Sequence, residues 1–85
     1  MVVEIDGLKV EVDTDKAADW HTFSILRKSD GASGYGHLAV LFEVIEYMTD
    51  QTEASIVEHL GGETAKASDV INLAMEIVQA ATSKN

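Results

Sequence analysis

Polar and apolar residues alternate over most of the first twelve positions, and this period of two places every second side chain on one face of a β-strand. Asp6 and Gly7 lie at the centre of the stretch and favour a type I′ turn, in which both central residues need positive φ angles. We therefore predict a β-hairpin over residues 1–12. The turn brings six apolar side chains to one face in three facing pairs, Ile5 with Leu8, Val3 with Val10 and Met1 with Val12.

Apolar residues then recur every three positions between residues 15 and 28, which predicts a helix with one apolar face. Either Asp13 or Thr14 can cap its N-terminus through a side-chain oxygen. We expect this face to lie in the core, with Trp20 as its anchor. The face consists of Ala17, Trp20, Phe23 and Leu26.

A stretch rich in glycine and serine at residues 29–36 indicates a loop. It lacks the Gly-Lys-Ser/Thr end of a phosphate-binding loop, so we interpret it as a connection. The segment that follows, 37–48, is strongly apolar and is predicted to be the second helix. Its main polar interruptions are Glu43 and Glu46.

The next predicted helix is short and spans residues 51–60. It begins in Asp-Gln-Thr-Glu, which resembles a capping box because an acceptor, Asp50, lies three residues before Glu53. It ends before Gly61 and Gly62, since glycine readily adopts the left-handed conformation that stops a helix.

A last helix is predicted at residues 67–82, with Thr64 or Ser68 as its cap. The chain is therefore expected to be a single domain, residues 1–85, of the α+β class and mostly α. Its N-terminal β-hairpin is followed by about four helices that pack as a small bundle.

The predicted helices at 37–48 and 67–82 are more apolar than an ordinary surface helix, whose apolar stripe spans about 100° or somewhat more. A domain of 85 residues can enclose one such helix, but two are hard to cover, so we expect part of both to contact other chains. The alternative is that the helices and the hairpin bury both within one copy. The N-terminal hairpin is a second candidate edge. The candidate partner-binding residues are Leu38, Leu41, Phe42, Ile45, Ile71, Met75 and Val78.

Charge narrows the choice of partners, because the chain has fifteen acidic and six basic residues and a net charge of −9. Such a field repels nucleic-acid phosphates and anionic membranes, so we expect neither as a partner. Cysteine is absent, and the sequence has neither a signal-peptide pattern at its start nor the roughly 20 apolar residues of a membrane span. A cytoplasmic location is therefore expected.

Catalytic and metal-binding motifs are missing from the sequence. The histidines, His21, His37 and His59, do not form an HxxxH or HExxH pair, and no GxSxG or GxGxxG motif occurs. We interpret the histidines as ordinary surface or boundary residues, and we predict a protein with no enzymatic activity, no cofactor and no metal.

Several features follow one another in a recognisable order along about residues 1–82. They are the opening hairpin, an acidic helix with Asp19-Trp20 and Phe23/Leu26, a glycine-rich break, an apolar helix, a short helix that ends at His59-Leu60-Gly61-Gly62, and the closing stretch Ala67 to Ala81. In this pattern of apolar spacing the chain resembles the small tail assembly chaperones of long-tailed phages and their prophages.

The resemblance implies a protein that binds the tape-measure protein, keeps its long apolar helices soluble and helps to recruit tail-tube subunits. It also implies self-association into a homo-oligomer, action in the cytoplasm of the bacterial host and absence from the mature virion. A competing hypothesis is an acidic inhibitor of a basic enzyme, such as a nucleic-acid mimic or an antitoxin, which the net charge of −9 motivates.

Overall fold

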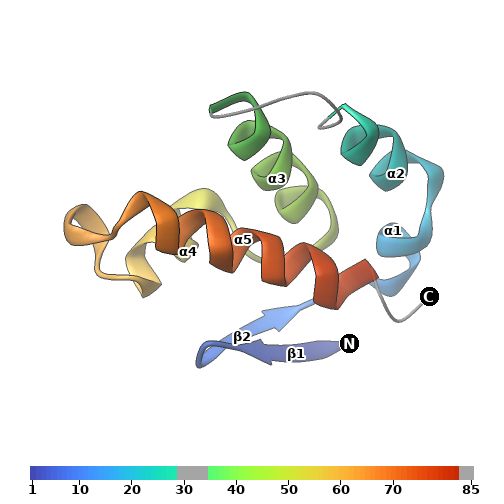
Figure 1. Ribbon diagram of the computed structural model, residues 1–85. Coiled ribbons are helices and arrows are strands. Elements are labelled where there is room, and N and C mark those ends of the chain that lie inside the picture. Colours follow the sequence, from blue (N-terminus) through green and yellow to red (C-terminus); the bar gives the residue numbers. More distant parts are fainter. Residues whose placement is uncertain (29–34, 83–85) are drawn as a thin grey trace.

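The computed structural model describes residues 1–28 and 35–82, in which a two-stranded antiparallel hairpin precedes a set of helices (Figure 1). The predicted α+β, mostly α fold is confirmed. The elements are β1 (Val2–Ile5), β2 (Leu8–Glu11), α1 (Thr14–Ala18), α2 (Trp20–Arg27), α3 (Tyr35–Met48), α4 (Glu53–His59), the 3₁₀ helix η1 (Gly62–Thr64) and α5 (Ala67–Thr82).

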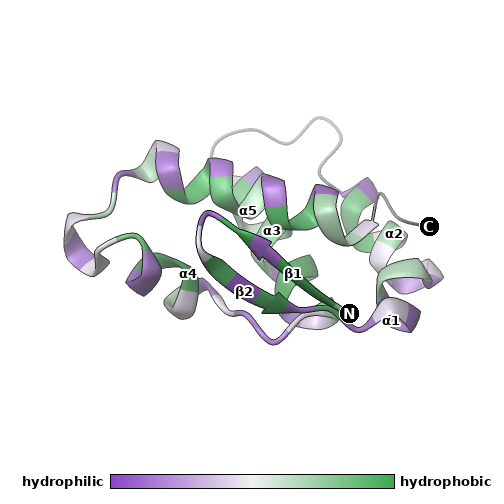
Figure 2. Ribbon diagram, turned by 90° about the horizontal axis from the view of Figure 1, so that it is seen from below, coloured by the Kyte–Doolittle hydropathy of each residue, from purple (hydrophilic) through white to green (hydrophobic). Residues whose placement is uncertain are grey.

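The hairpin has the predicted register, with Val3 opposite Val10. Asp6 and Gly7 have φ angles of 54° and 78°, the two left-handed positions that a type I′ turn requires. The hairpin lies along one side of α5 (Figures 1 and 2), and its apolar face becomes more buried along β2 until Val10 is fully enclosed. Turn chemistry and alternation therefore fix this part of the fold locally.

The outer edge of β2 is covered by the connection between α3 and α4. Val12 forms an isolated antiparallel bridge with Thr49. The backbone N–H of Asp50 donates to the Glu11 carbonyl at 3.1 Å, and an Asp50 carboxylate oxygen accepts from the Glu11 N–H at 3.0 Å. The edge that would otherwise expose unpaired backbone groups is thus closed by the chain itself.

The prediction of a single helix at 15–28 is wrong, because the helix is interrupted at Asp19, whose ψ angle is 165°. Asp13, one of the two predicted caps, accepts from the first turn of α1, and Asp19 accepts from the Thr22 N–H at 3.0 Å to cap α2. The break starts a new helix with its own direction. In α2 the buried side chains are Thr22 and Ile25.

Trp20 is consequently not a core anchor, and that prediction is wrong. Its side chain is 71% exposed, and Phe23 is 42% exposed. A spacing of three residues falls about 60° short of a full turn at each step, so the predicted face drifts around the helix even without a break. Ala17, from the same predicted face, is fully buried in α1.

The capping box of α4 uses different residues from the predicted pair. Thr52 accepts from the Ser55 N–H at 3.1 Å, and the Ser55 hydroxyl accepts from the Thr52 N–H at 2.8 Å. Asp50 instead binds the hairpin, as described above, and Glu53 is the first residue of the helix. The predicted start at 51–60 is therefore two residues early.

Gly61 and Gly62 end α4 with φ angles of 109° and 66°, as predicted for left-handed residues. The last helix, α5, has the predicted bounds of 67–82, but neither predicted cap holds. Thr64 lies in η1 and donates its hydroxyl to the Gly61 carbonyl, and Ser68 is already inside the first turn of α5.

The start of α3 also differs from the prediction. Its first two residues, Tyr35 and Gly36, belong to the predicted loop at 29–36, and the rest of that loop lies outside the described residues. Its end at Met48 agrees with the predicted helix at 37–48.

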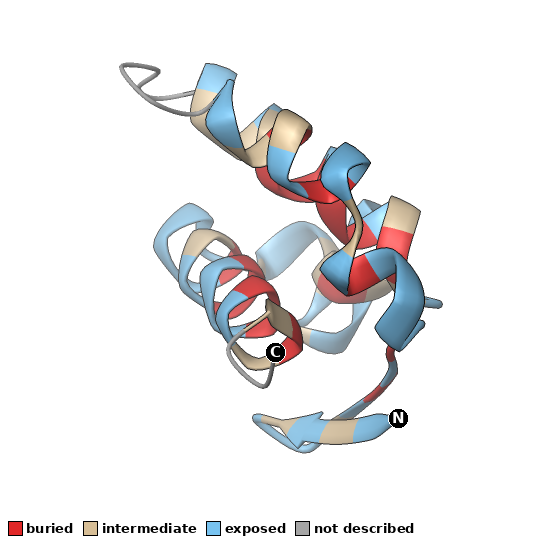
Figure 3. Ribbon diagram, turned by 90° about the vertical axis from the view of Figure 1, so that its right-hand side faces the viewer, coloured by how far each residue is buried: buried red, intermediate tan, exposed pale blue. Residues whose placement is uncertain are grey.

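Most of the apolar surface of α3 and α5 is buried within one copy of the chain, because the two helices pack against each other and the hairpin closes part of α5 (Figure 3). This outcome is closer to the alternative in which the fold covers both helices by itself. Their buried residues are Leu41, Phe42, Val44, Ile45 and Met48 of α3 and Val70, Leu73, Ala74, Ile77, Val78 and Ala81 of α5.

We expect Gly61→Ala to lower the free energy of unfolding by about 1–2 kcal/mol, because an L-residue is strained at positive φ. A Cβ atom at this position would also lie 2.9 Å from the Thr64 hydroxyl oxygen. Gly36→Ala is the matched control, since Gly36 is exposed in the first turn of α3 and alanine favours a helix. Urea denaturation followed by circular dichroism measures both. Equal stability of the two variants would contradict the left-handed stop.

Candidate functional site

A small apolar groove lies between α3 and α5, the two helices predicted to bind partners. Its free volume is about 170 Å³, and we call it the α3–α5 groove. Met75 is 39% exposed and forms a wall of the groove, whereas Leu41 and Val78 are buried and form its floor. It is lined by His37, Leu41, Met75, Val78 and Gln79, three of which belong to the predicted partner-binding set.

His37 lines this groove from the first turn of α3. Its Nδ1 atom is buried and has no hydrogen-bond partner within the described part of the chain. A buried polar group without a partner costs about 1–3 kcal/mol. The groove itself therefore offers mainly apolar contact.

A second groove runs along another side of α3, where that helix meets the start of α4. Its free volume is about 480 Å³, and we call it the α3–α4 groove. A Glu43 carboxylate oxygen lies 3.9 Å from the ammonium of Lys28, the residue after α2, and Glu46 accepts from the Glu53 N–H at 3.1 Å. The lining of the α3–α4 groove combines the apolar residues Leu38, Ala39 and Phe42 with the acidic residues Glu43, Glu46 and Glu53.

The seven predicted partner-binding residues do not form one surface. Leu41, Met75 and Val78 meet in the α3–α5 groove, while Leu38 and Phe42 line the α3–α4 groove. The other two lie in neither groove, since Ile45 is fully buried and Ile71 is half-buried. Leu41, Phe42 and Val78 are less than a tenth exposed, so a partner would touch them as the floor of a groove.

Sequence reasoning placed two aromatic residues in the core that are exposed in the structure. Trp20 and Phe23 project from α2, and the Arg27 guanidinium lies 5.7 Å from the centre of the Trp20 ring. Trp20, Phe23 and Arg27 are spaced by three and four residues, so they share the side of α2 away from its buried residues. Asp19, a good capping residue just before Trp20, was the signal that a new helix begins there.

A polar cluster joins the α1–α2 break to α3. The Tyr47 hydroxyl donates to the Asp19 carboxylate at 2.5 Å. The His21 ring packs edge-on against the Tyr47 ring, with 4.6 Å between the ring centres, and the Lys16 ammonium lies 5.2 Å from the centre of the Tyr47 ring. The Tyr47 hydrogen bond, with that from Thr22, lowers the pKa of Asp19, and the bond to Asp19 raises the pKa of Tyr47.

These shifts argue for a structural role of the cluster. A general acid or base works best when its pKa lies near the working pH. Here both pKa values move away from neutrality, so the carboxylate stays charged and the phenol stays protonated at pH 7. The bond between Asp19 and Tyr47 joins the start of α2 to α3.

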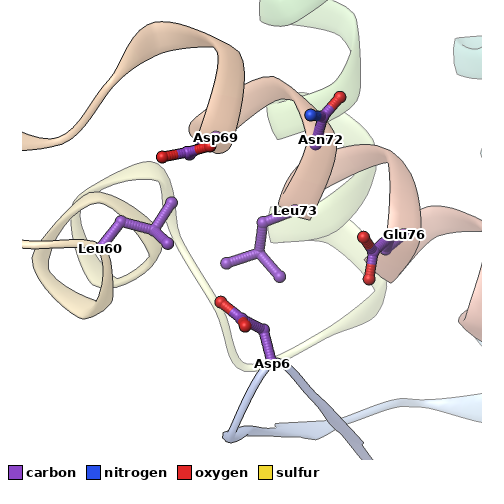
Figure 4. Close-up of a pocket in the computed structure, with 6 residues that line it drawn as sticks. All are labelled: Asp6, Leu60, Asp69, Asn72, Leu73 and Glu76. Carbon is purple, nitrogen blue, oxygen red and sulfur yellow. The ribbon is translucent and has the colours of Figure 1, made fainter.

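An acidic pocket of about 500 Å³ opens between the hairpin turn, the end of α4 and α5 (Figure 4). His59 stands near it and bonds the Asp6 carbonyl through Nε2 at 2.8 Å. Within residues 1–28 and 35–82 no three histidine, aspartate or glutamate side chains are grouped to hold a metal ion. The pocket lining is Asp6, Leu60, Asp69, Asn72, Leu73 and Glu76.

None of the helices in the described ranges combines the length and the hydrophobicity that crossing a membrane requires. Comparisons of the chain with protein-family models, with curated proteins and with solved structures found no match. The residues, their geometry and the sequence pattern are therefore the basis on which a function can be proposed.

We expect Tyr47→Phe to destabilise the fold at neutral pH and to have a smaller effect in acid. Because the pKa of Asp19 is lowered on folding, its contribution is complete above the unfolded value of about 3.9 and is lost as the pH falls through the folded value. The pKa of Tyr47 is raised on folding, so its contribution to stability is complete below the unfolded value of about 10. That contribution is lost only as the pH rises through the folded value.

Urea midpoints of the wild type and of Tyr47→Phe between pH 2 and pH 8 test this dependence. Asp19→Asn, alone and combined with Tyr47→Phe, completes a double-mutant cycle that isolates the bond between the two side chains. The same loss of stability at the acidic and neutral ends of the range would show that the bond to a charged Asp19 is not what Tyr47 contributes.

Proposed function

We propose that this protein is a non-enzymatic binding protein that holds an apolar helix of a partner in the α3–α5 groove. The observation that carries the proposal is an apolar groove between the two most apolar helices, with Met75 39% exposed at its wall. An amphipathic helix that places apolar side chains in such a groove is a common mode of recognition.

The size of the groove supports a protein partner over a small molecule. Cofactor and substrate pockets usually measure about 300–1,000 Å³, and they bury most of their ligand. At about 170 Å³ the α3–α5 groove has room for anchoring side chains of a larger partner. The exposed side chain of Met75 is flexible and adapts to helices of different sequence, which suits a protein that keeps a client soluble.

The sequence pattern extends this proposal to a phage tail assembly chaperone that acts in the cytoplasm of a bacterial host. Its client would be the helices of the tape-measure protein, and tail-tube subunits would be recruited to the same complex. The hairpin, the two apolar helices and the net charge of −9 all suit that role, since a strongly charged complex stays soluble while its apolar surfaces are covered.

An inhibitor of a basic enzyme is the second candidate, and the acidic pocket in Figure 4 favours it. The carboxylates of Asp6, Asp69 and Glu76 line that pocket without a lysine or arginine beside them in its lining. Binding through these groups would weaken steeply as salt is added, because exposed charges are screened within about 8 Å at physiological ionic strength. Binding in the apolar α3–α5 groove would change little as salt is added, because it does not depend on exposed charges.

We expect Met75→Glu to weaken client binding at least about ten-fold, because it places a charge on the groove wall. The measurement is co-expression with a phage tape-measure protein, the proposed client, followed by the solubility of that client and by titration of the purified proteins at low and high salt. Met75→Leu should retain binding. Val2→Glu, which adds the same charge to the exposed face of β1, is the matched control.

Unchanged binding by Met75→Glu would contradict the groove as the client site. Loss of binding in 0.5 M salt, together with weaker binding after Asp69→Asn and Glu76→Gln, would instead support the acidic inhibitor. These two polar substitutions lie on the exposed side of α5 and leave its buried face intact.

A further inference from the structure

The outer edge of β1 is the open edge of the hairpin. Met1 and Val12 bond each other in both directions, with backbone N···O distances of 3.0 and 2.7 Å. The alternation of an antiparallel ladder therefore turns the N–H and C=O groups of Val2 and Glu4 away from β2. Within the described part of the chain these groups have no hydrogen-bond partner. The edge thus offers two donors and two acceptors to a further strand.

β1 also lacks the features that usually protect such an edge. The sequence contains no proline, and the register of β1 on β2 has no bulge. The charged side chain of β1, Glu4, belongs to the exposed face of the strand and not to the half-buried face. The opposite edge is closed, because residues 49–51 bond the backbone of Glu11 and of Lys9. The chain therefore covers one edge of the hairpin and leaves the other accessible to a partner strand.

A groove with a free volume of about 570 Å³ lies between β1 and α5, and we call it the β1–α5 groove. It adjoins the acidic pocket of Figure 4, since Glu76 lines both. The hairpin follows α5 in two perpendicular views, so a strand added to β1 would run along this groove (Figures 1 and 2). Every second side chain of that strand would enter it. The lining is Ile5, Glu76, Gln79, Ala80 and Thr82.

The side chains beside the open edge define the chemistry of the added strand. Ile5 and Ala80 give the groove apolar surface, which suits apolar side chains at the positions that enter it. Glu4 lies on the other face of β1, and neither Glu4 nor Glu76 has an ion pair among the described residues. A lysine or arginine on the added strand opposite Glu4 would supply the missing cation, because facing side chains of opposite charge stabilise neighbouring strands.

We propose that β1 binds an extended segment of a partner protein by strand addition, and that apolar residues alternate in this segment with lysine or arginine. The segment becomes a third strand, bonds the backbone of Val2 and Glu4 and fills the β1–α5 groove with its apolar side chains. A second copy of this chain does not match. Its β1 has no basic residue, and the edge of its β2, which carries Lys9, is already closed.

Strand addition goes beyond the proposed binding of a client helix and does not depend on it. Met75 and Val78, which line the α3–α5 groove, do not line the β1–α5 groove, and Gln79 is the one residue that the two linings share. One site takes a helix by its apolar side chains, whereas the other takes an extended segment by its backbone. Two different segments of a partner can therefore be recognised by two sides of α5.

The probe for this site is a fluorescein-labelled peptide of alternating valine and lysine, about eight residues long, within the usual length of a strand. Fluorescence anisotropy of the peptide with the full chain measures the affinity. N-methylation of every second residue, on the side that would face β1, removes backbone donors and keeps every charge. We expect it to weaken binding at least about ten-fold, the equivalent of one or two lost hydrogen bonds. A valine–glutamate peptide should not bind.

Substitutions at Glu4 separate the backbone contact from the charge. Glu4→Gln removes the carboxylate and should weaken binding a few-fold, as expected for one exposed ion pair. Glu4→Pro also removes the outward N–H and should weaken it at least about ten-fold, while the pair with Lys9 has no ladder bond to lose. Glu11→Gln is the matched control, because it removes an exposed carboxylate from the strand with the closed edge and should change binding little.

Circular dichroism establishes that Glu4→Pro is folded, and the N-methylated peptide tests the same bonds in the unaltered protein. Equal binding of the methylated and unmethylated peptides would overturn the proposal, since the contact would then be electrostatic alone. Full binding by folded Glu4→Pro would also overturn it, as would a wild type that does not bind the peptide up to about 1 mM. Met75→Glu should bind this peptide as the wild type does, so the result is independent of the client helix.

Discussion

The pairing between the outer edge of β2 and the connection after α3 is the contact on which the rest of the fold depends. A two-stranded hairpin is marginal by itself in water. Here Val12 pairs with Thr49, Asp50 exchanges two hydrogen bonds with Glu11, and the Gln51 amide donates to the Lys9 carbonyl at 3.2 Å. Gln51 is only 8% exposed, so this bond lies within the fold. The pairing fixes where α3 ends, and it leaves the apolar face of the hairpin available to α5.

Burial of α3 and α5 follows from that arrangement and limits where a partner can bind. Met48 and Ile45 of α3 and Ile77 of α5 are fully buried, so the centre of their contact is core and cannot also be an open surface. What remains accessible lies at its margins. The α3–α5 groove and the α3–α4 groove use different residues of the same helix, Leu41 in one and Phe42 in the other. The two grooves therefore lie on different sides of α3.

Sequence predicted those features that local chemistry decides. The hairpin register followed from Asp6-Gly7 with alternation, and the bounds of α5 followed from a long apolar period. The caps were harder, because Asp50 satisfies the capping-box pattern as well as Thr52 does, and only the position of the hairpin assigns Asp50 to another partner. The candidate site was predicted in part. Composition identified α3 and α5, but which of their residues become floor, wall or core depends on packing that no local pattern encodes.

The exposure of Trp20 can be traced to a single carboxylate. One oxygen of Asp19 accepts from the Thr22 N–H at 3.0 Å and starts α2, and the other accepts from the Tyr47 hydroxyl at 2.5 Å and holds that start against α3. With both bonds made, Ile25 turns inward and the opposite side of α2 must face water. An exposed tryptophan is costly to hydrate. The exposure of Trp20 therefore follows from the same two hydrogen bonds that start α2 and join it to α3.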